Sequence, residues 1–308
     1  MYLKEQTYIL EIYNARSLSK AADKLHLTQP ALSSFLANVE EELGIPLFTR
    51  TNRNLIPTKA GELYVRTARK MIRIQEQFQQ ELSPLLEAPS GTLRIGIQRI
   101  RTAHLSPLLT HYFAERYPNI KLVITRRSMR PLRKMLADDE VDLLLAFYIP
   151  YQFPSKEYSH YVIEKDRILL AVPEHSALPV IPAQENAQSS SPYPAIDIRT
   201  CSEYPFILQP LGTSMRYYAD RLFKQHQMNP VKNIEDDSIE AALRMTGLGM
   251  GLSFTMESYV RHMSLPAGIR LCAIAGEPEE PVFALITKKQ PDPPKYLRDL
   301  AAHIKTTF

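Results

Sequence analysis

A short run near the amino terminus carries side chains that can read DNA bases. Their hydroxyl and amide groups can hydrogen-bond to base edges in a major groove, and the ring edge of a proline can contact a thymine methyl. The residues of this run are Thr28, Gln29, Pro30, Ser33, Ser34 and Asn38. The chemistry that these residue types predict is sequence readout, without bond making or breaking.

Two short helices joined by a tight turn are predicted to present this run. Ser17 can cap a first helix whose apolar positions recur up to Leu25, and Thr28 can cap a second helix that begins at about Gln29. Gly44 supplies a left-handed stop. The apolar positions of the second helix are Leu32, Leu36, Val39 and Leu43. The pattern predicts a helix-turn-helix, although amphipathic helices with polar outer faces are common.

A basic hairpin is predicted directly after the second helix. The turn-rich stretch 51–54 separates two short apolar runs, 46–50 and 55–57. Arg50 and Arg53 on this hairpin are placed to contact phosphates or a narrow minor groove. The hairpin therefore indicates a wing beside the helix-turn-helix.

The ordered motifs from Ser17 to Gly61 resemble the winged helix-turn-helix of LysR-type transcriptional regulators. The resemblance is carried by KAADKLHLTQPALS, EEELGIPLFTR and LIPTKAGE. The chain departs from the family at Ser34 and Phe35, where a long polar or basic pair is usual. The resemblance implies double-stranded operator DNA, a small-molecule effector and the transcription machinery as partners.

Composition is that of a globular protein, and we expect no metal or cofactor. The 308 residues are 44% hydrophobic and 23% charged, with a net charge of +4. No apolar run is long enough for a membrane span, so we expect a cytoplasmic protein. Cys201 and Cys272 lie far apart without metal-like spacing, which favours buried thiols over a redox switch.

One long helix from Thr58 to about Leu86 is predicted to pair two copies of the chain. Apolar residues at alternating spacings of four and three are typical of a coiled-coil seam, although a single helix packed on its own core remains an alternative. The seam residues are Tyr64, Ala68, Met71, Gln75, Phe78, Leu82 and Leu85. A homodimer, or a tetramer built from it, is expected. The basic residues between positions 50 and 73 fit either DNA contact or a solvated helix face.

The remainder alternates strands and helices, which predicts two α/β lobes. They resemble the two-lobed, periplasmic-binding-protein-like effector domain of the same family. The expected domains are 1–58 for the winged helix-turn-helix, 59–90 for the linker helix and hinge, and 91–308 for effector binding. Within the last, we expect a first lobe at about 92–161 with 267–308 and a second at about 162–266.

Turns that follow strands are predicted to line a ligand cleft between the lobes, because ligands of open α/β sheets bind beyond the carboxyl ends of strands. Helix N-termini and nearby arginines favour a small anion, although each arginine could equally form surface or interlobe ion pairs. The expected contacts are Gln98, Ile100, Arg101, Thr102, Arg127, Ser128, Phe147, Gln209, Leu211 and Thr213.

Two other classes of protein compete with a regulator. An enzyme could be suggested by the glycines of residues 247–251, but they follow a helix and lead into a strand, the reverse of a dinucleotide-binding turn. A solute-binding protein would explain two lobes but leaves the first 90 residues without a role. We therefore expect a non-enzymatic, DNA-binding regulator.

Overall fold

The computed structural model describes residues 3–50, 55–82, 91–182, 191–230, 233–261, 264–276, 280–290 and 295–307. The chain forms two compact units. The first contains residues 1–94, 110–123 and 135–142, and the second contains the remaining residues from 95 to 308. In the described ranges, no helix has both the length and the apolar character that crossing a membrane requires.

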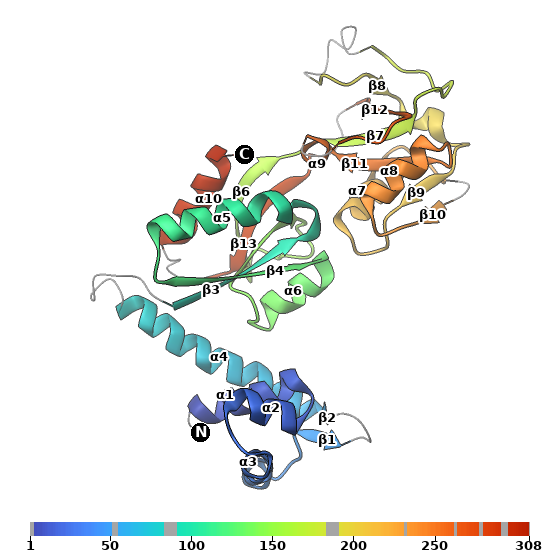
Figure 1. Ribbon diagram of the computed structural model, residues 1–308. Helices are drawn as coiled ribbons and strands as arrows, with labels where there is room; N and C mark the ends of the chain where they lie inside the picture. The colour runs from blue at the N-terminus through green and yellow to red at the C-terminus, as the bar shows by residue number, and fades with distance from the viewer. Residues whose placement is uncertain are drawn as a thin grey trace. The chain divides into compact units, whose positions relative to one another are not determined.

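The amino-terminal head is built as the caps predict. Its elements are α1 (Leu3–Ala15), α2 (Leu18–Leu25), α3 (Gln29–Leu43), β1 (Phe48–Arg50) and β2 (Leu55–Pro57) (Figure 1). The hydroxyl of Ser17 accepts from the N–H of Lys20 at the start of α2, and His26 ends that helix at φ 54°. Gly44 ends α3 at φ 66°, where glycine avoids the cost of a Cβ. The tight turn between α2 and α3 follows from these local signals.

Helix α4 (Lys59–Leu82) leaves the head after β2. Thr58 starts it, because its hydroxyl accepts from the N–H of Gly61 and donates to the carbonyl of Pro46. Gly61 is needed there, since a Cβ would lie 2.0 Å from the carbonyl oxygen of Leu47. Further along, Arg69 pairs with Glu140 at 2.7 Å within the same compact unit. Part of the basic run is therefore neutralised by acidic partners.

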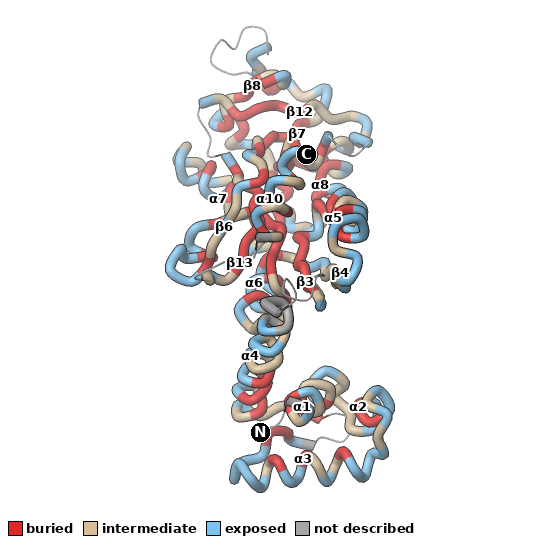
Figure 2. The backbone as a smooth tube through the Cα atoms, turned by 90° about the vertical axis from the view of Figure 1, so that its left-hand side faces the viewer, coloured by how far each residue is buried: buried red, intermediate tan, exposed pale blue. Residues whose placement is uncertain are grey.

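A five-stranded sheet has the order β4-β3-β5-β13-β6. Its strands are β3 (Gly91–Gln98), β4 (Ile120–Arg127), β5 (Leu143–Tyr148), β6 (Tyr158–Lys165) and β13 (Val282–Lys288). Strands β3 and β5 are parallel, whereas β13 runs antiparallel to both β5 and β6. Its helices are α5 (Thr102–Arg116), α6 (Met129–Ala137) and α10 (Lys295–Thr307). Strand β13 is buried along most of its length (Figure 2).

A six-stranded sheet has the order β10-β9-β11-β7-β12-β8. Its strands are β7 (Ile168–Pro173), β8 (Ala195–Ile196), β9 (Phe206–Leu208), β10 (Asn233–Glu235), β11 (Leu252–Met256) and β12 (Ile269–Ile274). Its helices are α7 (Ser214–Gln225), α8 (Ile239–Gly247) and α9 (Glu257–Val260). Stacked Phe206 and Phe254 lie in its core, with ring centroids 5.7 Å apart.

The lobe boundaries differ from those expected. Strand β12 pairs with β7 and β8, so it belongs to the six-stranded sheet and not to the first lobe that was predicted to begin again at 267. Strand β6 extends the five-stranded sheet to Lys165, beyond the predicted boundary at 161. Both strands lie where the chain passes from one sheet to the other. The alternation of apolar and polar residues along a strand does not say which sheet the strand joins.

Candidate nucleic-acid interface and ligand cleft

The outer face of α3 is polar and open to solvent. The hydroxyl of Thr28 accepts from the N–H of Ala31, which caps the helix. Thr28, Gln29, Pro30, Ser34 and Asn38 are exposed, and Ser33 is half-buried. The opposite face is anchored, because Leu32, Leu36 and Val39 are buried in the core of the head. The structure thus brings all six predicted base-reading residues to α3 and its N-cap, and five of them are exposed.

Phe35 explains the departure from the family pattern beside Ser34. Its ring packs edge-on against Tyr8 of α1, with centroids 5.2 Å apart, and both rings border the core of the head. Such edge-to-face pairs add about 0.5–1.5 kcal/mol beyond the area they bury. Phe35 therefore packs α3 against α1, and the polar side chains that could contact DNA are its neighbours on α3.

The wing is joined to α3 through one carboxylate. The Oε1 atom of Glu40 accepts from the N–H groups of Leu47 and Phe48 at 2.6 Å and 2.9 Å. Strands β1 and β2 pair antiparallel, which agrees with the predicted hairpin. Arg50 ends β1, but its side chain is not among those described, and Arg53 lies outside the described residues.

The predicted dimerisation seam on α4 needs correction at two positions. Tyr64 and Ala68 are buried in the core of their own head, so they cannot face a second copy. The predicted seam is wrong at these positions because the first half of α4 packs on the core of the head. Leu63, Ile74 and Phe78 are instead exposed by 59%, 65% and 58%. Met71 is half-buried and Gln75 exposed, whereas the side chain of Leu82 and all of Leu85 lie outside the description.

A hollow of about 340 Å³ lies where several helices begin. Ser128 and Met129 start α6, Thr213 and Ser214 start α7, and Ser238 caps α8. We call this hollow the cleft. Helix N-termini direct free N–H groups and the positive end of the helix dipole toward it, which favours an anion. Its remaining lining comprises Gln98, Arg99, Arg126, Gln209, Met215, Asp237, Ile239, Glu240 and Tyr259.

Gln98 connects the two sheets at the base of the cleft. Its Oε1 accepts from the N–H of Phe147 at 3.1 Å, and its Nε2 donates to the hydroxyl of Ser214 at 2.9 Å. Both side-chain atoms are therefore used, and the residue is only 7% exposed. Gln98 holds the end of β3 against the start of α7, so a ligand in the cleft would adjoin this bridge.

Two nearby arginines have contrasting surroundings. Arg99 is half-exposed at the cleft, and its guanidinium lies 3.3 Å from the carboxylate of Asp237. Arg101 is only 4% exposed and does not line the cleft. Its guanidinium pairs with Glu164 at 2.6 Å and Asp166 at 2.7 Å, donates to Ser258, and lies over the ring of Phe283. The structure places Arg101 in a buried ion network.

The other expected cleft residues are divided. Ser128, Gln209 and Thr213 line the cleft with Gln98. Four other expected residues do not line it. The hydroxyl of Thr102 contacts the carbonyls of Gln98 and Arg99, and the exposed Arg127 donates to the carbonyl of Arg126. The ring of Phe147 is buried, and Leu211 borders a separate hollow. The side chain of Ile100 is not described.

Sequence reasoning missed other lining residues on α8 and near it. Asp237 and Ser238 precede α8, where the hydroxyl of Ser238 accepts from the N–H of Ala241. This cap is a signal that could have found them. Tyr259 carried no local signal, because only the fold brings it to the cleft, whereas Arg126 is one of the arginines on which the expectation of an anion was based.

The glycines of residues 247–251 serve packing. A Cβ on Gly247 would lie 2.5 Å from the carbonyl oxygen of Ala267, and one on Gly251 would lie 2.7 Å from that of Pro205. Gly249 has φ 77°. Close backbone approach and a left-handed turn therefore account for this run. Among the residues described, no group of three or more metal-ligating side chains comes together.

Both cysteines are buried free thiols. Burial raises the pKa of Cys201 to about 11, and it also raises the pKa of Cys272. A thiol is a nucleophile only when it has lost its proton, so neither residue has the character of a reactive thiolate at neutral pH. These surroundings fit structural thiols.

Comparisons with known proteins show the family. A model described as "Bacterial regulatory helix-turn-helix protein, lysR family" matches residues 3–62, and one described as "LysR substrate binding domain" matches residues 86–308. The chain belongs to the LysR family of DNA-binding transcriptional regulators, which carry an effector-binding domain and are not enzymes.

Relatives and solved structures agree with that assignment. The transcriptional dual regulator GltC of Bacillus subtilis is 28% identical over 84% of this chain and 81% of its own. The uncharacterised regulator YcgK of the same species is 25% identical over 94% and 90%. The fold resembles full-length CbnR crystallised with its target DNA, with a TM-score of 0.64 at 19% identity and full coverage of both chains.

Proposed function

We propose that the exposed face of α3 discriminates DNA sequences and that the wing arginines supply mainly phosphate affinity. The observation that carries this proposal is the capped helix with Leu32, Leu36 and Val39 buried on one side and amides and hydroxyls exposed on the other. Base contacts specify sequence, whereas phosphate contacts bind all DNA alike and weaken with salt.

Gln29→Ala tests the proposal. The ratio of specific to nonspecific affinity should fall by about 1–3 kcal/mol if Gln29 makes a good bidentate contact with adenine. Gln225→Ala, an exposed glutamine at the end of α7, serves as the matched control. Fluorescence anisotropy on operator and scrambled DNA over a salt series gives the ratio. An unchanged ratio in the Gln29 variant would remove this residue from the proposed contacts.

A homodimer is supported by the apolar stripe of Leu63, Ile74 and Phe78 on α4. Exposed apolar side chains at helical spacing favour burial against a second copy, and a two-fold pair would place two heads on one duplex. Tetramers formed from such dimers, and contact with the transcription machinery, are compatible with this arrangement.

Ile74→Glu with Phe78→Glu tests the corrected seam. Like charges in the helix pair should split the dimer and lower DNA affinity, because linked heads bind a second half-site at high effective concentration. Leu248→Glu, at a leucine that is 79% exposed elsewhere, is the control. Analytical ultracentrifugation measures the outcome, and an oligomer that survives the double change must be held by another surface.

The cleft is proposed to bind a small anionic effector that modulates DNA binding. Support comes from the three helix N-termini, with Arg99 and Arg126 beside them. A ligand changes DNA affinity only through its preference for one arrangement of the protein, and such couplings are typically about 1–3 kcal/mol. The proposed contacts are Gln98, Ser128, Gln209 and Thr213. Arg101 is proposed as a support of the surrounding structure.

A further inference from the structure

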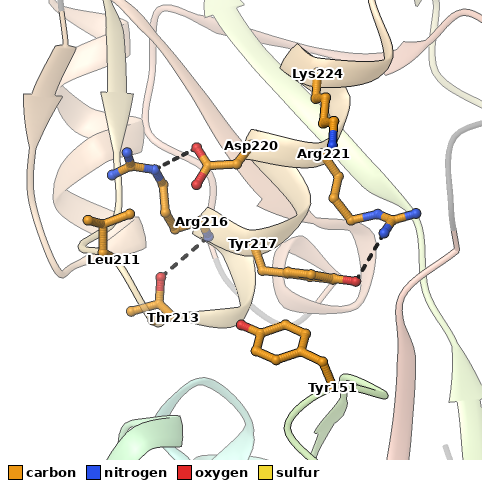
Figure 3. A pocket seen from close by; sticks show the side chains of 9 residues that line it. Tyr151, Leu211, Thr213, Arg216, Tyr217, Asp220, Arg221 and Lys224 are labelled. Carbon is orange, nitrogen blue, oxygen red and sulfur yellow. Dashed lines mark hydrogen bonds and ion pairs between the residues drawn. The ribbon is translucent and has the colours of Figure 1, made fainter.

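A second hollow, of about 250 Å³, lies along α7. We call it the α7 pocket. Figure 3 shows Tyr217 on α7 facing Tyr151, which comes from the segment after β5. The two ring centroids are 5.5 Å apart at 46°. Both rings are accessible, since Tyr151 is 63% exposed and Tyr217 half-buried, so a planar group could lie along them.

Cations follow the aromatic wall along the same helix. Arg221 lies over the ring of Tyr217, with its guanidinium 5.6 Å from the centroid, and donates to the phenol oxygen at 3.3 Å (Figure 3). Lys224 lies one turn further, exposed and without an ion-pair partner in the described part of the chain. The ring of Tyr217 thus orients one cation, and a second is available beside it.

The only carboxylate in the pocket's lining is already engaged. Asp220 accepts from the Nε atom of Arg216 at 2.8 Å, and that guanidinium also reaches the carbonyl of Gln209 at 3.3 Å. With three cations against one carboxylate, the lining repels a cationic ligand and attracts an anion. Leu211, exposed by 74%, adds an apolar edge.

We propose that the α7 pocket is a second ligand site, separate from the cleft, which takes a planar aromatic anion of about one ring. The ring would stack on Tyr151 and Tyr217, and its carboxylate or phosphate would pair with Arg221 and Lys224. The volume lies below that of pockets for drug-sized ligands, which limits the guest to a small molecule. Aromatic stacking and ionic pairing together explain why this lining combines both residue types.

Thr213 gives the site a route to the rest of the domain. This residue lines both the α7 pocket and the cleft, and its hydroxyl accepts from the N–H of Arg216 as the cap of α7. A ligand in the α7 pocket would therefore act on the same helix start that the cleft uses. Such a ligand would be a co-effector whose binding is coupled to that of the first.

Calorimetric titration of the full chain with four probes tests the site. Phenyl phosphate and benzoate should bind saturably. Cyclohexanecarboxylate, which keeps the charge and loses the aromatic face, should bind about fivefold to tenfold more weakly, as should inorganic phosphate. Equal binding of benzoate and cyclohexanecarboxylate would overturn the aromatic assignment, and no saturation by either aryl probe up to about 10 mM would overturn the site.

Variants locate the binding. Tyr151→Ser and Lys224→Gln alter exposed residues of the pocket's lining, and each should weaken the binding of phenyl phosphate at least about fivefold. Lys305→Gln, an exposed lysine on α10, and Arg99→Gln in the cleft should leave its affinity unchanged. Affinity that is lost in Arg99→Gln but survives in the first two variants would place the probe in the cleft and overturn the proposal.

Discussion

Arg99 and Arg101 begin and end one short turn after β3, yet they occupy opposite environments. Arg99 is exposed by 51% and faces the equally open Asp237, whereas Arg101 is 4% exposed and pairs with Glu164 and with Asp166, whose side chain is fully buried. An arginine beside a cleft is therefore not by itself a ligand contact. The burial of the arginine and its ion-pair partners decide whether it can bind a ligand or stabilises the structure around the cleft.

The difference predicts unequal costs of substitution. A buried charge that loses its partner stays desolvated, and the cost is about 3–5 kcal/mol. An exposed pair is screened by water and contributes about 0–1 kcal/mol. The carboxylate of Asp166 also accepts from the N–H groups of Arg167 and Ser258, and these hydrogen bonds fix its position. Removing Arg101 would leave that carboxylate without its cation.

The largest effect is expected for Arg101→Ala. The free energy of unfolding should fall by about 3–5 kcal/mol, because Asp166 and Glu164 would remain buried or half-buried without the guanidinium. Urea unfolding followed by circular dichroism gives the loss, with Arg99→Ala as the matched control. A midpoint shift no larger than that of the control would show that both arginines are equivalent, and the comparison would fail.

An intermediate effect is expected from the buried thiol of Cys201. The pKa of Cys201 is about 11 in the folded protein against 9.0 as its ordinary value, and burial is the main cause. Between these two pH values the unfolded thiol has lost its proton while the folded one keeps it. The unfolded state therefore binds fewer protons, and stability must fall as pH rises from about 9 to 11.

Cys201→Ala isolates this contribution, because Cys272 and the other groups that titrate in alkali are retained. Stability measured against pH should decline less steeply in the variant between pH 9 and 11. At pH 8 a disulfide reagent should react slowly with the folded wild type and fast after denaturation. Rapid labelling of the folded protein would show that Cys201 opens to solvent, contrary to its complete burial.

The smallest effect on stability is expected for Arg99→Gln, although this variant should bind an anion in the cleft more weakly. Its unfolding free energy should change by less than about 1 kcal/mol, since the pair with Asp237 is exposed. If the cleft binds an anion, a panel of small carboxylates and phosphates should then stabilise wild type against heat and the variant less. A ligand that stabilises both equally must bind outside the cleft.

Local signals in the sequence were sufficient for the head. Ser17, Thr28, Pro30 and Gly44 act through neighbours within a few residues, so the caps and bounds of α2 and α3 could be predicted without the fold. The seam expected on α4 is wrong at Tyr64 and Ala68, because these residues follow the same spacing whether they pack on their own core or on a second copy.

Long-range contacts limited the prediction of the cleft. Ser128 and Thr213 were found because each precedes a helix that follows a strand, which the sequence pattern shows. Arg101 was expected beside them, but its partners Glu164 and Asp166 lie more than 60 residues away along the chain. Tyr259 reaches the cleft from α9, a helix too short to be predicted from the periodicity of its apolar residues.

The position of β13 sets the order in which the protein can be completed during synthesis. This strand is made from residues 282–288, yet it lies between β5 and β6 in the five-stranded sheet. The head and the described part of α4 end by residue 82. At about 5–20 residues per second, the ribosome needs roughly 10–40 s to add the intervening stretch of about 200 residues. During that interval the residues of the head have already been made, while the five-stranded sheet still lacks β13.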